Sequence, residues 1–383
     1  MNNISIFSNC YGCGVCVKAC PSKIITLSLN KDGFYVPRVN KQDCTECGLC
    51  LAVCAYADQN VIQADIKIKA YAAWSQDVQV RKNCSSGGIG FEIGRYLLEK
   101  GFKVCGVRYN LERNRAEHYI ASNETELISS MGSKYMQSYT IEGWSQINKN
   151  ENYLIIGAPC QIDSFRRYIQ KYKIESHFIL MDFFCHGVPS ILMWNKYLAE
   201  VEKKAGKALY ISWRSKLTGW HDSYNMLIKG EKAVYNSKLS RGDLFYCMFL
   251  NNVCLNKACY NKCKYKYLSS AADIRIGDLW GKTFQKNEEG VTGVVTFTER
   301  GLKVVNSVPG VVLQEYPIDV VTEGQMRKNV SLPFYYSWTM FMLKSSCSIY
   351  AFKPLLFICK LINYGKIRYS RLKSIIKRHN EKY

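Results

Sequence analysis

The cysteines near the start of the chain have the spacing of ligands for iron–sulfur clusters. Two sets follow the pattern C-x2-C-x2-C-x3-C: Cys10, Cys13, Cys16 and Cys20, and then Cys44, Cys47, Cys50 and Cys54. In this pattern three thiolates bind one 4Fe-4S cluster, and the fourth binds the neighbouring cluster. We therefore predict one cluster on Cys10, Cys13, Cys16 and Cys54, and a second on Cys44, Cys47, Cys50 and Cys20.

Zinc and disulfides are the alternative uses of these cysteines. Zinc sites favour C-x2-C pairs with longer spacers between them. Disulfides are rare in reducing compartments, and the N-terminus lacks the basic stretch and apolar run of a secretory signal. We therefore predict a redox protein that is located in the cytoplasm.

A later group of cysteines predicts a third cluster or another metal site. Cys254, Cys259 and Cys263 lie within ten residues of each other, and the fourth ligand would be Cys160, Cys185 or Asp278.

Two segments that run from a strand through a turn to a helix carry the candidate catalytic residues. Cys160 lies in the first, where a helix N-terminus would lower the pKa of its thiol. Cys185 and His186 follow the next predicted strand. Because ligands bind at the carboxyl ends of strands in open α/β sheets, we expect all three residues at one sheet edge. Inert buried cysteines and a structural histidine are the alternative.

Two other segments are candidates for binding an anionic cofactor. Ser85, Ser86, Gly87 and Gly88 precede a predicted helix, whose free backbone N–H groups and dipole favour a phosphate. An ordinary capping loop is the alternative. Lys134 and Tyr135 lie in a polar loop, for which a solvated loop is the alternative.

The elements that must position these residues follow from apolar periodicity. Residues 1–65 predict a ferredoxin-type module with a short strand near 34–39, and residues 66–80 a linker or entry strand. The pattern then becomes α/β up to about residue 205, and shorter strands dominate to residue 320. The predicted strands are 103–107, 153–156, 178–183, 209–213, 224–228, 273–276 and 291–297, and the predicted helices are 89–99, 161–172 and 190–204.

The charge of the chain predicts acidic partners. There are 52 Lys and Arg against 31 Asp and Glu, a formal net charge of +21. A phosphorylated cofactor, an acidic electron carrier or an anionic membrane face would suit it. We expect no nucleic acid, since the sequence contains no recognised nucleic-acid-binding module.

The last forty residues are basic and partly apolar. Residues 344–382 contain ten Lys or Arg and one acid, Glu381. The segment is too charged to span a bilayer. It predicts either an amphipathic helix on the inner face of the membrane or a helix packed on this protein or a partner.

Taken together, the ordered segments resemble the coenzyme F420 hydrogenase/dehydrogenase beta subunit family. The resemblance covers about residues 1–320, and its most specific parts are Pro159-Cys160-Gln161 and Cys185-His186-Gly187-Val188-Pro189-Ser190. One departure is the pair Cys259 and Cys263, which are separated by three residues where the family pattern has two.

The resemblance implies an α+β protein with a bacterial-type ferredoxin domain (1–65) and an α/β flavin-binding region with a mixed sheet in two parts (66–150 and 151–330). The residues beyond it add the basic helical tail (331–383). It also implies FAD, with the cofactor bound by Ser85, Ser86, Gly87, Gly88, Lys134, Tyr135, Gly157, Pro159 and Gln161.

The predicted function is that of an iron–sulfur flavoprotein oxidoreductase. Electrons would pass between 4Fe-4S clusters and a two-electron partner at FAD, such as the deazaflavin coenzyme F420 or another substrate. The resemblance also links the chain to surface-polysaccharide synthesis. The alternatives are a ferredoxin-like electron-transfer partner without catalytic flavin, and a membrane-surface scaffold with vestigial redox parts.

Overall fold

The N-terminal module is an antiparallel hairpin flanked by two short helices. The computed structural model describes residues 2–61, 68–359 and 361. The module contains η1 (Ile4–Ile6), α1 (Val15–Ala19), β1 (Ile25–Leu29), β2 (Tyr35–Val39) and α2 (Leu49–Ala52). Gly14 and Gly48 precede the two helices with φ angles of 71° and 74°, a backbone conformation that glycine adopts without strain. The doubled cysteine spacing thus corresponds to a doubled loop–helix structure.

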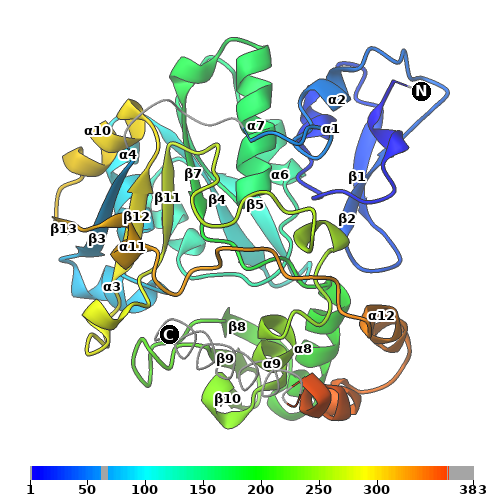
Figure 1. The fold of residues 1–383 in the computed structure, drawn as a ribbon, viewed down its shortest axis with the longest axis vertical. Coiled ribbons are helices and arrows are strands. Elements are labelled where there is room, and N and C mark those ends of the chain that lie inside the picture. Colours follow the sequence, from blue (N-terminus) through cyan, green and yellow to red (C-terminus); the bar gives the residue numbers. More distant parts are fainter. Residues whose placement is uncertain (1, 62–67, 360, 362–383) are drawn as a thin grey trace, which may run out of the picture.

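The centre of the molecule is a mixed sheet of eight strands (Figure 1). Its strands are β3 (Lys69–Ser75), β4 (Lys103–Asn110), β5 (Arg115–Ala121), β6 (Tyr153–Ile156), β7 (Phe178–Phe183), β11 (Ile274–Asp278), β12 (Thr292–Thr296) and β13 (Val311–Glu315). Their order is β13-β3-β12-β11-β7-β6-β4-β5. The pairings make β3, β11, β7, β6 and β4 run in one direction and β5, β12 and β13 in the other. Five strands therefore end at the same edge.

Helices cover both faces of this sheet because its central strands are apolar on both sides. Leu154 and Ile179 face a core that includes α4, whereas Ile155 and Leu180 face a core that includes α7. The helices of this part are α3 (Val78–Asn83), α4 (Ile89–Glu99), α5 (Glu124–Leu127), η2 (Ile128–Ser130), α6 (Ile141–Gln146), α7 (Pro159–Lys171), η3 (Glu175–His177), η6 (Lys282–Phe284), α10 (Glu299–Ser307) and α11 (Ile318–Val321). Side chains of α1 pack into the same core as α7, which joins the N-terminal module to the sheet.

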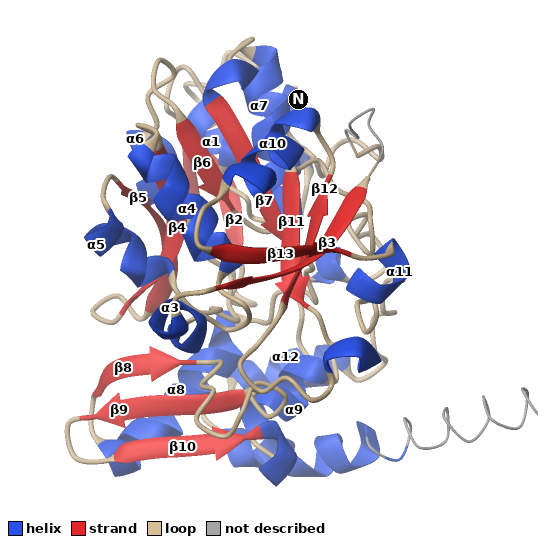
Figure 2. Cartoon of the chain, turned by 90° about the vertical axis from the view of Figure 1, so that its left-hand side faces the viewer, coloured by secondary structure: helices blue, strands red, loops and turns tan. Residues whose placement is uncertain are grey.

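A second, smaller sheet lies apart from the large one, with helices packed against it (Figure 2). It has the order β10-β9-β8 and is antiparallel. Its elements are α8 (Ile191–Ala205), β8 (Ala208–Ser212), β9 (Asn225–Gly230), β10 (Val234–Lys238), η4 (Leu239–Arg241), α9 (Leu244–Leu250), η5 (Lys257–Cys259), α12 (Tyr336–Lys344) and η7 (Ile349–Phe352). Helix α8 carries the chain from the carboxyl edge of the large sheet into this unit, so the two sheets flank the loops at that edge.

The mixed α/β architecture with a ferredoxin-like N-terminal region is the predicted one, and three predicted elements have the observed bounds: β6, β7 and α4. Of the linker or entry strand predicted for residues 66–80, the strand is confirmed, since β3 lies inside the large sheet between β12 and β13. Strands β1, β5, β10 and β13 were not predicted. Of these, β1, β10 and β13 are partly exposed and lack continuous apolar runs.

The tail is described only in part. Helix α12 and η7 belong to the predicted tail and pack on α8, while residue 360 and residues 362–383 lie outside the described residues. In the part of the chain that the structure describes, no helix is both long enough and apolar enough to cross a bilayer.

Candidate redox and cofactor site

The eight N-terminal cysteines line two separate cavities. Cys10, Cys13, Cys16 and Cys54 line one, and Cys20, Cys44, Cys47 and Cys50 line the other. These are the two predicted ligand groups, in which the fourth cysteine of each set joins the first three cysteines of the other set. Burial raises the pKa of Cys10 to about 12 and that of Cys54 to about 11. Buried thiols of this kind are stable as thiolates only when bound to positively charged iron, so the donor set fits 4Fe-4S clusters.

Hydrogen bonds from residues 137–144, which lie beside the large sheet, fix the first cysteine loop. Trp144 Nε1 and Thr140 Oγ1 both donate to the carbonyl oxygen of Cys13, at 2.9 and 3.0 Å. Gln137 donates to the carbonyl of Tyr11 at 3.0 Å and accepts from the backbone N–H of Tyr35 at 2.7 Å. The loop is therefore held at a fixed position relative to α6 and the large sheet.

A third group consists of Cys160, Cys185, Cys259 and Cys263, brought together from three segments. Burial raises the pKa of Cys160 well above its usual value, and the nearby Cys185, Cys259, Cys13 and Cys263 raise it further. The expected lowering by the N-terminus of α7 is therefore wrong for this structure, since desolvation of the thiol outweighs the helix dipole. Burial likewise raises the pKa of Cys259 to about 12.

Cys254 does not belong to this group, which corrects the predicted ligand set. Its thiol lies 3.5 Å from the sulfur of Met193, inside the core around α8. Asp278 is also not a fourth ligand, since both of its carboxylate oxygens bind Arg214. Sequence proximity suggested Cys254, but the chain turns away between it and Cys259.

His186 is held in an apolar setting next to Cys185. Its ring lies 4.7 Å from that of Phe249, and burial lowers its pKa to about 4. The imidazole is therefore neutral at pH 7. Lys266 fixes the same loop, because its ammonium donates to the carbonyl oxygens of Cys185 and His186 at 2.7 and 2.9 Å.

The three cysteine groups are neighbours. In addition to burial, the charge of Cys50 in the second group raises the pKa of Cys16 in the first, and the charge of Cys13 in the first group raises that of Cys160 in the third, so the groups lie within electrostatic reach of each other. Tyr11 lies between the first and third groups, with its ring in edge contact with Tyr265 at 5.7 Å. The order in space is therefore second, first, third.

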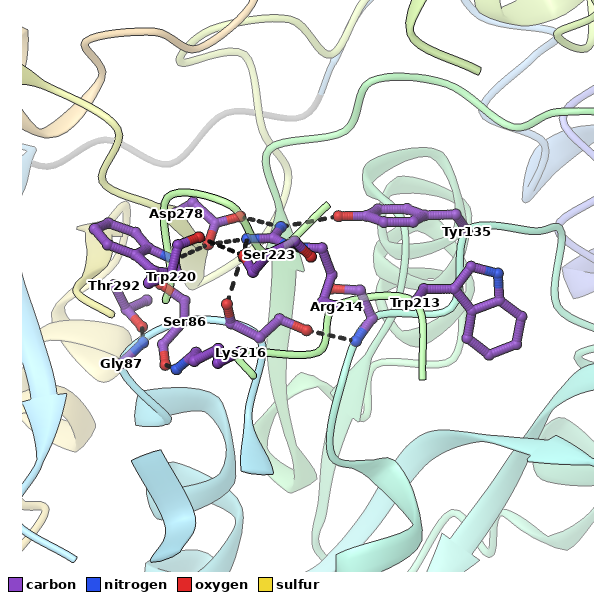
Figure 3. A network of polar contacts seen from close by, with 12 residues as sticks. Ser86, Gly87, Tyr135, Trp213, Arg214, Lys216, Trp220, Ser223, Asp278 and Thr292 are labelled. Carbon is purple, nitrogen blue, oxygen red and sulfur yellow. Dashed lines mark hydrogen bonds and ion pairs between the residues drawn. The ribbon is translucent and has the colours of Figure 1, made fainter. Parts of the chain in front are cut away.

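Beyond the third group, a polar network centred on Arg214 lies between the two sheets (Figure 3). The buried guanidinium donates to both oxygens of Asp278 at 2.8 and 3.1 Å and to the hydroxyl of Tyr135 at 2.9 Å. It lies over the rings of Tyr224 and Trp280 at 4.8 and 5.0 Å. Arg214 follows β8 and Asp278 ends β11, so no sequence pattern could have paired them. Tyr135 was predicted as a site residue.

Phe249 connects this network to the third cysteine group. Its ring contacts both Tyr135, at 5.1 Å, and His186, at 4.7 Å.

Two buried lysines flank the loop that contains Ser85 and Gly88. Lys216 Nζ donates to the carbonyl oxygens of Arg81, Ser86 and Glu289 at 2.7, 2.5 and 2.6 Å. Lys134 Nζ donates to those of Ser129, Ser130 and Met131 at 3.2, 3.0 and 2.8 Å. Burial lowers the pKa of Lys134 to about 7 and that of Lys216 to about 8. Lys216 was not predicted, because it lies in a loop without any flanking motif.

Packing and backbone conformation explain why glycine occupies positions 87 and 88. A Cβ on Gly87 would clash with the carbonyl oxygen of Ala73 and lie 2.8 Å from the backbone nitrogen of Thr292. Its missing side chain is thus explained by packing between β3 and β12. Gly88 caps α4 with a φ of 87°. The Ser85 hydroxyl accepts from the N–H of Ser133 at 2.8 Å, and Ser86 donates to the carbonyl of Val291 at 2.7 Å.

The segment from Gly157 to Gln161 forms the start of α7. Pro159 is the first residue of the helix, and the side-chain oxygen of Gln161 accepts from the N–H of Ala158 at 2.8 Å. Gln161 also donates to the Ser138 hydroxyl at 3.1 Å. A Cβ on Gly157 would lie 3.0 Å from that side-chain oxygen. These residues fix the start of the helix that carries Cys160, and their contact with a cofactor stays a prediction.

Known protein families match most of this chain. A 4Fe-4S dicluster domain matches residues 9–57. Two models of one family, coenzyme F420 hydrogenase/dehydrogenase beta subunit, match residues 70–142 (N-terminal part) and 150–318 (C-terminal part). The dicluster domain implies two 4Fe-4S clusters. The chain belongs to the coenzyme F420 hydrogenase/dehydrogenase beta subunit family.

Individual relatives are distant. The coenzyme F420-dependent sulfite reductase of Methanocaldococcus jannaschii is 25% identical over 172 residues, which cover 44% of this chain and 26% of that protein. The chain thus matches about a quarter of the length of that relative. A chain of the F420-reducing [NiFe] hydrogenase complex from Methanosarcina barkeri has a TM-score of 0.47 and 16% identity, covering 73% of this chain and 98% of that chain.

Proposed function

We propose that this protein passes electrons between a two-electron substrate at FAD and a row of three 4Fe-4S clusters. The observation that supports this most is the sequence of neighbouring groups: the second, first and third cysteine groups, then Phe249, then the Arg214 network. A flavin exchanges electrons singly or in pairs, whereas each cluster takes one at a time. Such a row of carriers would connect the two kinds of chemistry.

The proposed third cluster is held by Cys160, Cys185, Cys259 and Cys263. Their burial and mutual proximity fit a cluster, as for the first group. The longer spacing between Cys259 and Cys263 is taken up by a turn, in which the N–H of Cys263 donates to the carbonyl of Tyr260 at 3.1 Å. His186 is neutral and packed on Phe249, so we propose that it shields this site rather than acting as an acid.

The proposed flavin site lies beside Arg214, Lys134 and Lys216. These three cations are buried or partly buried, and the carboxylate bound to Arg214 is that of Asp278 alone. The excess of positive charge fits the diphosphate of FAD, and the N-terminus of α4 adds its dipole. The residues of this chain would bind and orient the cofactor, while the flavin itself supplies the redox chemistry.

The proposed substrate is a deazaflavin of the F420 type, which rests on the family and on the name of the sulfite reductase relative. A partner protein would exchange electrons with the second cysteine group, in which Cys47 is exposed. A cytoplasmic location remains a prediction that follows from the oxygen-sensitive ligands. Neither the site residues nor the comparisons support a role in polysaccharide synthesis.

Iron and flavin analysis of anaerobically reconstituted protein tests the proposal. We expect about twelve iron atoms and one FAD per chain, since each cubane cluster holds four iron atoms. Cys259→Ala should lose about four of the iron atoms. Cys254→Ala, a matched control at a buried thiol outside the group, should keep the full content.

Two results would contradict the proposal in different ways. Eight iron atoms with no loss in Cys259→Ala would remove the third cluster. Full iron without FAD would instead support the alternative of a plain electron-transfer partner.

A further inference from the structure

The C-terminal part of the described chain exposes an unusual number of large apolar side chains. Phe334, Phe341 and Phe357 are 84%, 67% and 63% exposed, and Trp338, Ile358 and Leu361 are 46%, 45% and 57% exposed. We call these six residues the C-terminal apolar face. A contact between the rings of Trp338 and Phe352, at 6.4 Å, joins α12 to the segment that leads to Phe357.

The pattern of α12 differs from that of an ordinary surface helix. Tyr336, Met340 and Leu343 are buried against the core around α8, as the helical period requires. The outward side of a surface helix is normally polar, but here it presents Trp338 and Phe341. An apolar side that the described residues leave uncovered indicates a binding surface.

The charges in the stretch of sequence that carries this face are of one sign. From residue 324 to residue 380 the chain contains eleven Lys or Arg and no Asp or Glu. Two of these cations, Arg327 and Lys344, are paired with Asp319 and Asp32 of other segments. The others have no acid in their own part of the sequence, so the segment as a whole attracts anionic surfaces.

We propose that the C-terminal apolar face docks on an anionic phospholipid bilayer. Aromatic and aliphatic side chains enter the boundary between headgroups and acyl chains, while nearby Lys and Arg contact the anionic headgroups. An apolar face within a basic segment is less suited to a protein partner. Such a partner would need an apolar groove and, around it, acidic residues that match the basic residues along the whole segment. In both views α12 lies in the lower half of the molecule, beside the helices of the smaller sheet, whereas α1 lies in the upper half (Figures 1 and 2).

The test is co-sedimentation of the full-length, cluster-loaded protein with vesicles of phosphatidylcholine alone or mixed with phosphatidylglycerol. We expect binding to the anionic vesicles that weakens at high salt. The triple variant Phe334→Gln, Phe341→Gln, Phe357→Gln should lose at least about tenfold in affinity, since interfacial binding scales with buried apolar area. A matched control carries Val78→Gln, Leu209→Gln and Val234→Gln, at residues 69%, 57% and 64% exposed elsewhere, and should bind like the wild type.

A second readout reports on the face directly. Phospholipids with brominated acyl chains should quench tryptophan fluorescence in the wild type, and Trp338→Phe should remove most of that quenching. The proposal is overturned if the wild type binds neither vesicle, or if the two triple variants lose affinity equally. It is also overturned if the wild type forms a dimer, or a complex with an acidic protein, that only the phenylalanine variant loses, while vesicle binding is unaffected. Iron and flavin contents do not enter this test.

Discussion

At the scale of single residues, Lys134 and Lys216 are the most informative side chains of the proposed cofactor site. Each ammonium group is satisfied by three backbone carbonyls, but neither has a carboxylate of its own among its hydrogen-bond partners. Burial is the largest cause of the shift and lowers the pKa of Lys134 to about 7 and that of Lys216 to about 8. An anionic ligand nearby would reverse that shift.

We therefore predict that the affinity for FAD falls as the pH rises from 6.5 to 9. At the lower pH both lysines are protonated in the free protein. As the pH passes their pKa values of about 7 and 8, the free protein loses these charges and must regain protons to bind a phosphate. Linkage then weakens binding by up to about tenfold per pH unit for each proton taken up. Calorimetric titration of flavin-free protein measures this slope.

Riboflavin and three variants serve as controls for this prediction. Riboflavin has no phosphate, so its affinity should not depend on pH in this range. Lys134→Met and Lys216→Met should each reduce the slope for FAD, while Lys303→Met, at an exposed position on α10, should not. Equal slopes for FAD and riboflavin would show that these lysines do not contact the phosphates.

At the scale of elements, the carboxyl edge of the large sheet depends on a buried ion pair between β7 and β11. Arg275 and Asp182 are opposite each other in the parallel register, and both are 0% exposed. Arg275 Nε and Nη2 donate to the two carboxylate oxygens at 2.7 and 2.6 Å. Cys185 lies in the loop that follows β7 and Asp278 ends β11, so this ion pair positions both parts of the site.

Arg275→Met should lower the free energy of unfolding by about 3–5 kcal/mol, because it leaves the Asp182 carboxylate buried without its counter-charge. Asp182→Leu combined with Arg275→Met should recover most of that loss, since two apolar side chains leave no buried charge. Urea unfolding followed by tryptophan fluorescence measures both. A single variant as stable as the wild type would mean that water or another cation compensates the carboxylate.

At the scale of the whole molecule, the N-terminal module and the large sheet differ in what holds them together. The core cluster of the module contains Ile4, Cys16, Ile25, Cys50 and Cys54, so three of its five buried members are cysteines. The large sheet instead has apolar cores on both faces. Small modules with little apolar core depend on their metal for stability.

Removal of iron with a chelator should therefore loosen residues 9–57 while the large sheet stays folded. Hydrogen exchange should accelerate at the amides of β1 and β2, and those of β6 and β7 should remain protected as in the loaded protein. Uniform protection in both states would show that packing against α6 and α7, rather than the clusters, stabilises the module.

The sequence by itself determined the local features of this protein. The cysteine spacing led to the two groups that line the two cavities, because such loops bring their ligands together over a few residues. The apolar runs of β6 and β7 and the amphipathic pattern of α4 gave those elements their bounds, since burial on one or both faces is written in residue order. The family resemblance, which the comparisons confirm, also depended on ordered local segments.

Only the tertiary structure decided which distant residues meet. It separated Cys254 from Cys259 and joined Cys160 and Cys185 to the latter, although Cys254 is nearer in sequence. It paired Arg214 with Asp278 and placed Lys216 beside Ser86, contacts between segments more than sixty residues apart. It also turned Phe341 outward and Met340 inward on one helix. The physical reason is that such contacts arise when sheets and helices pack, and packing depends on the whole chain, whereas the sequence pattern reports only the neighbours of each residue along it.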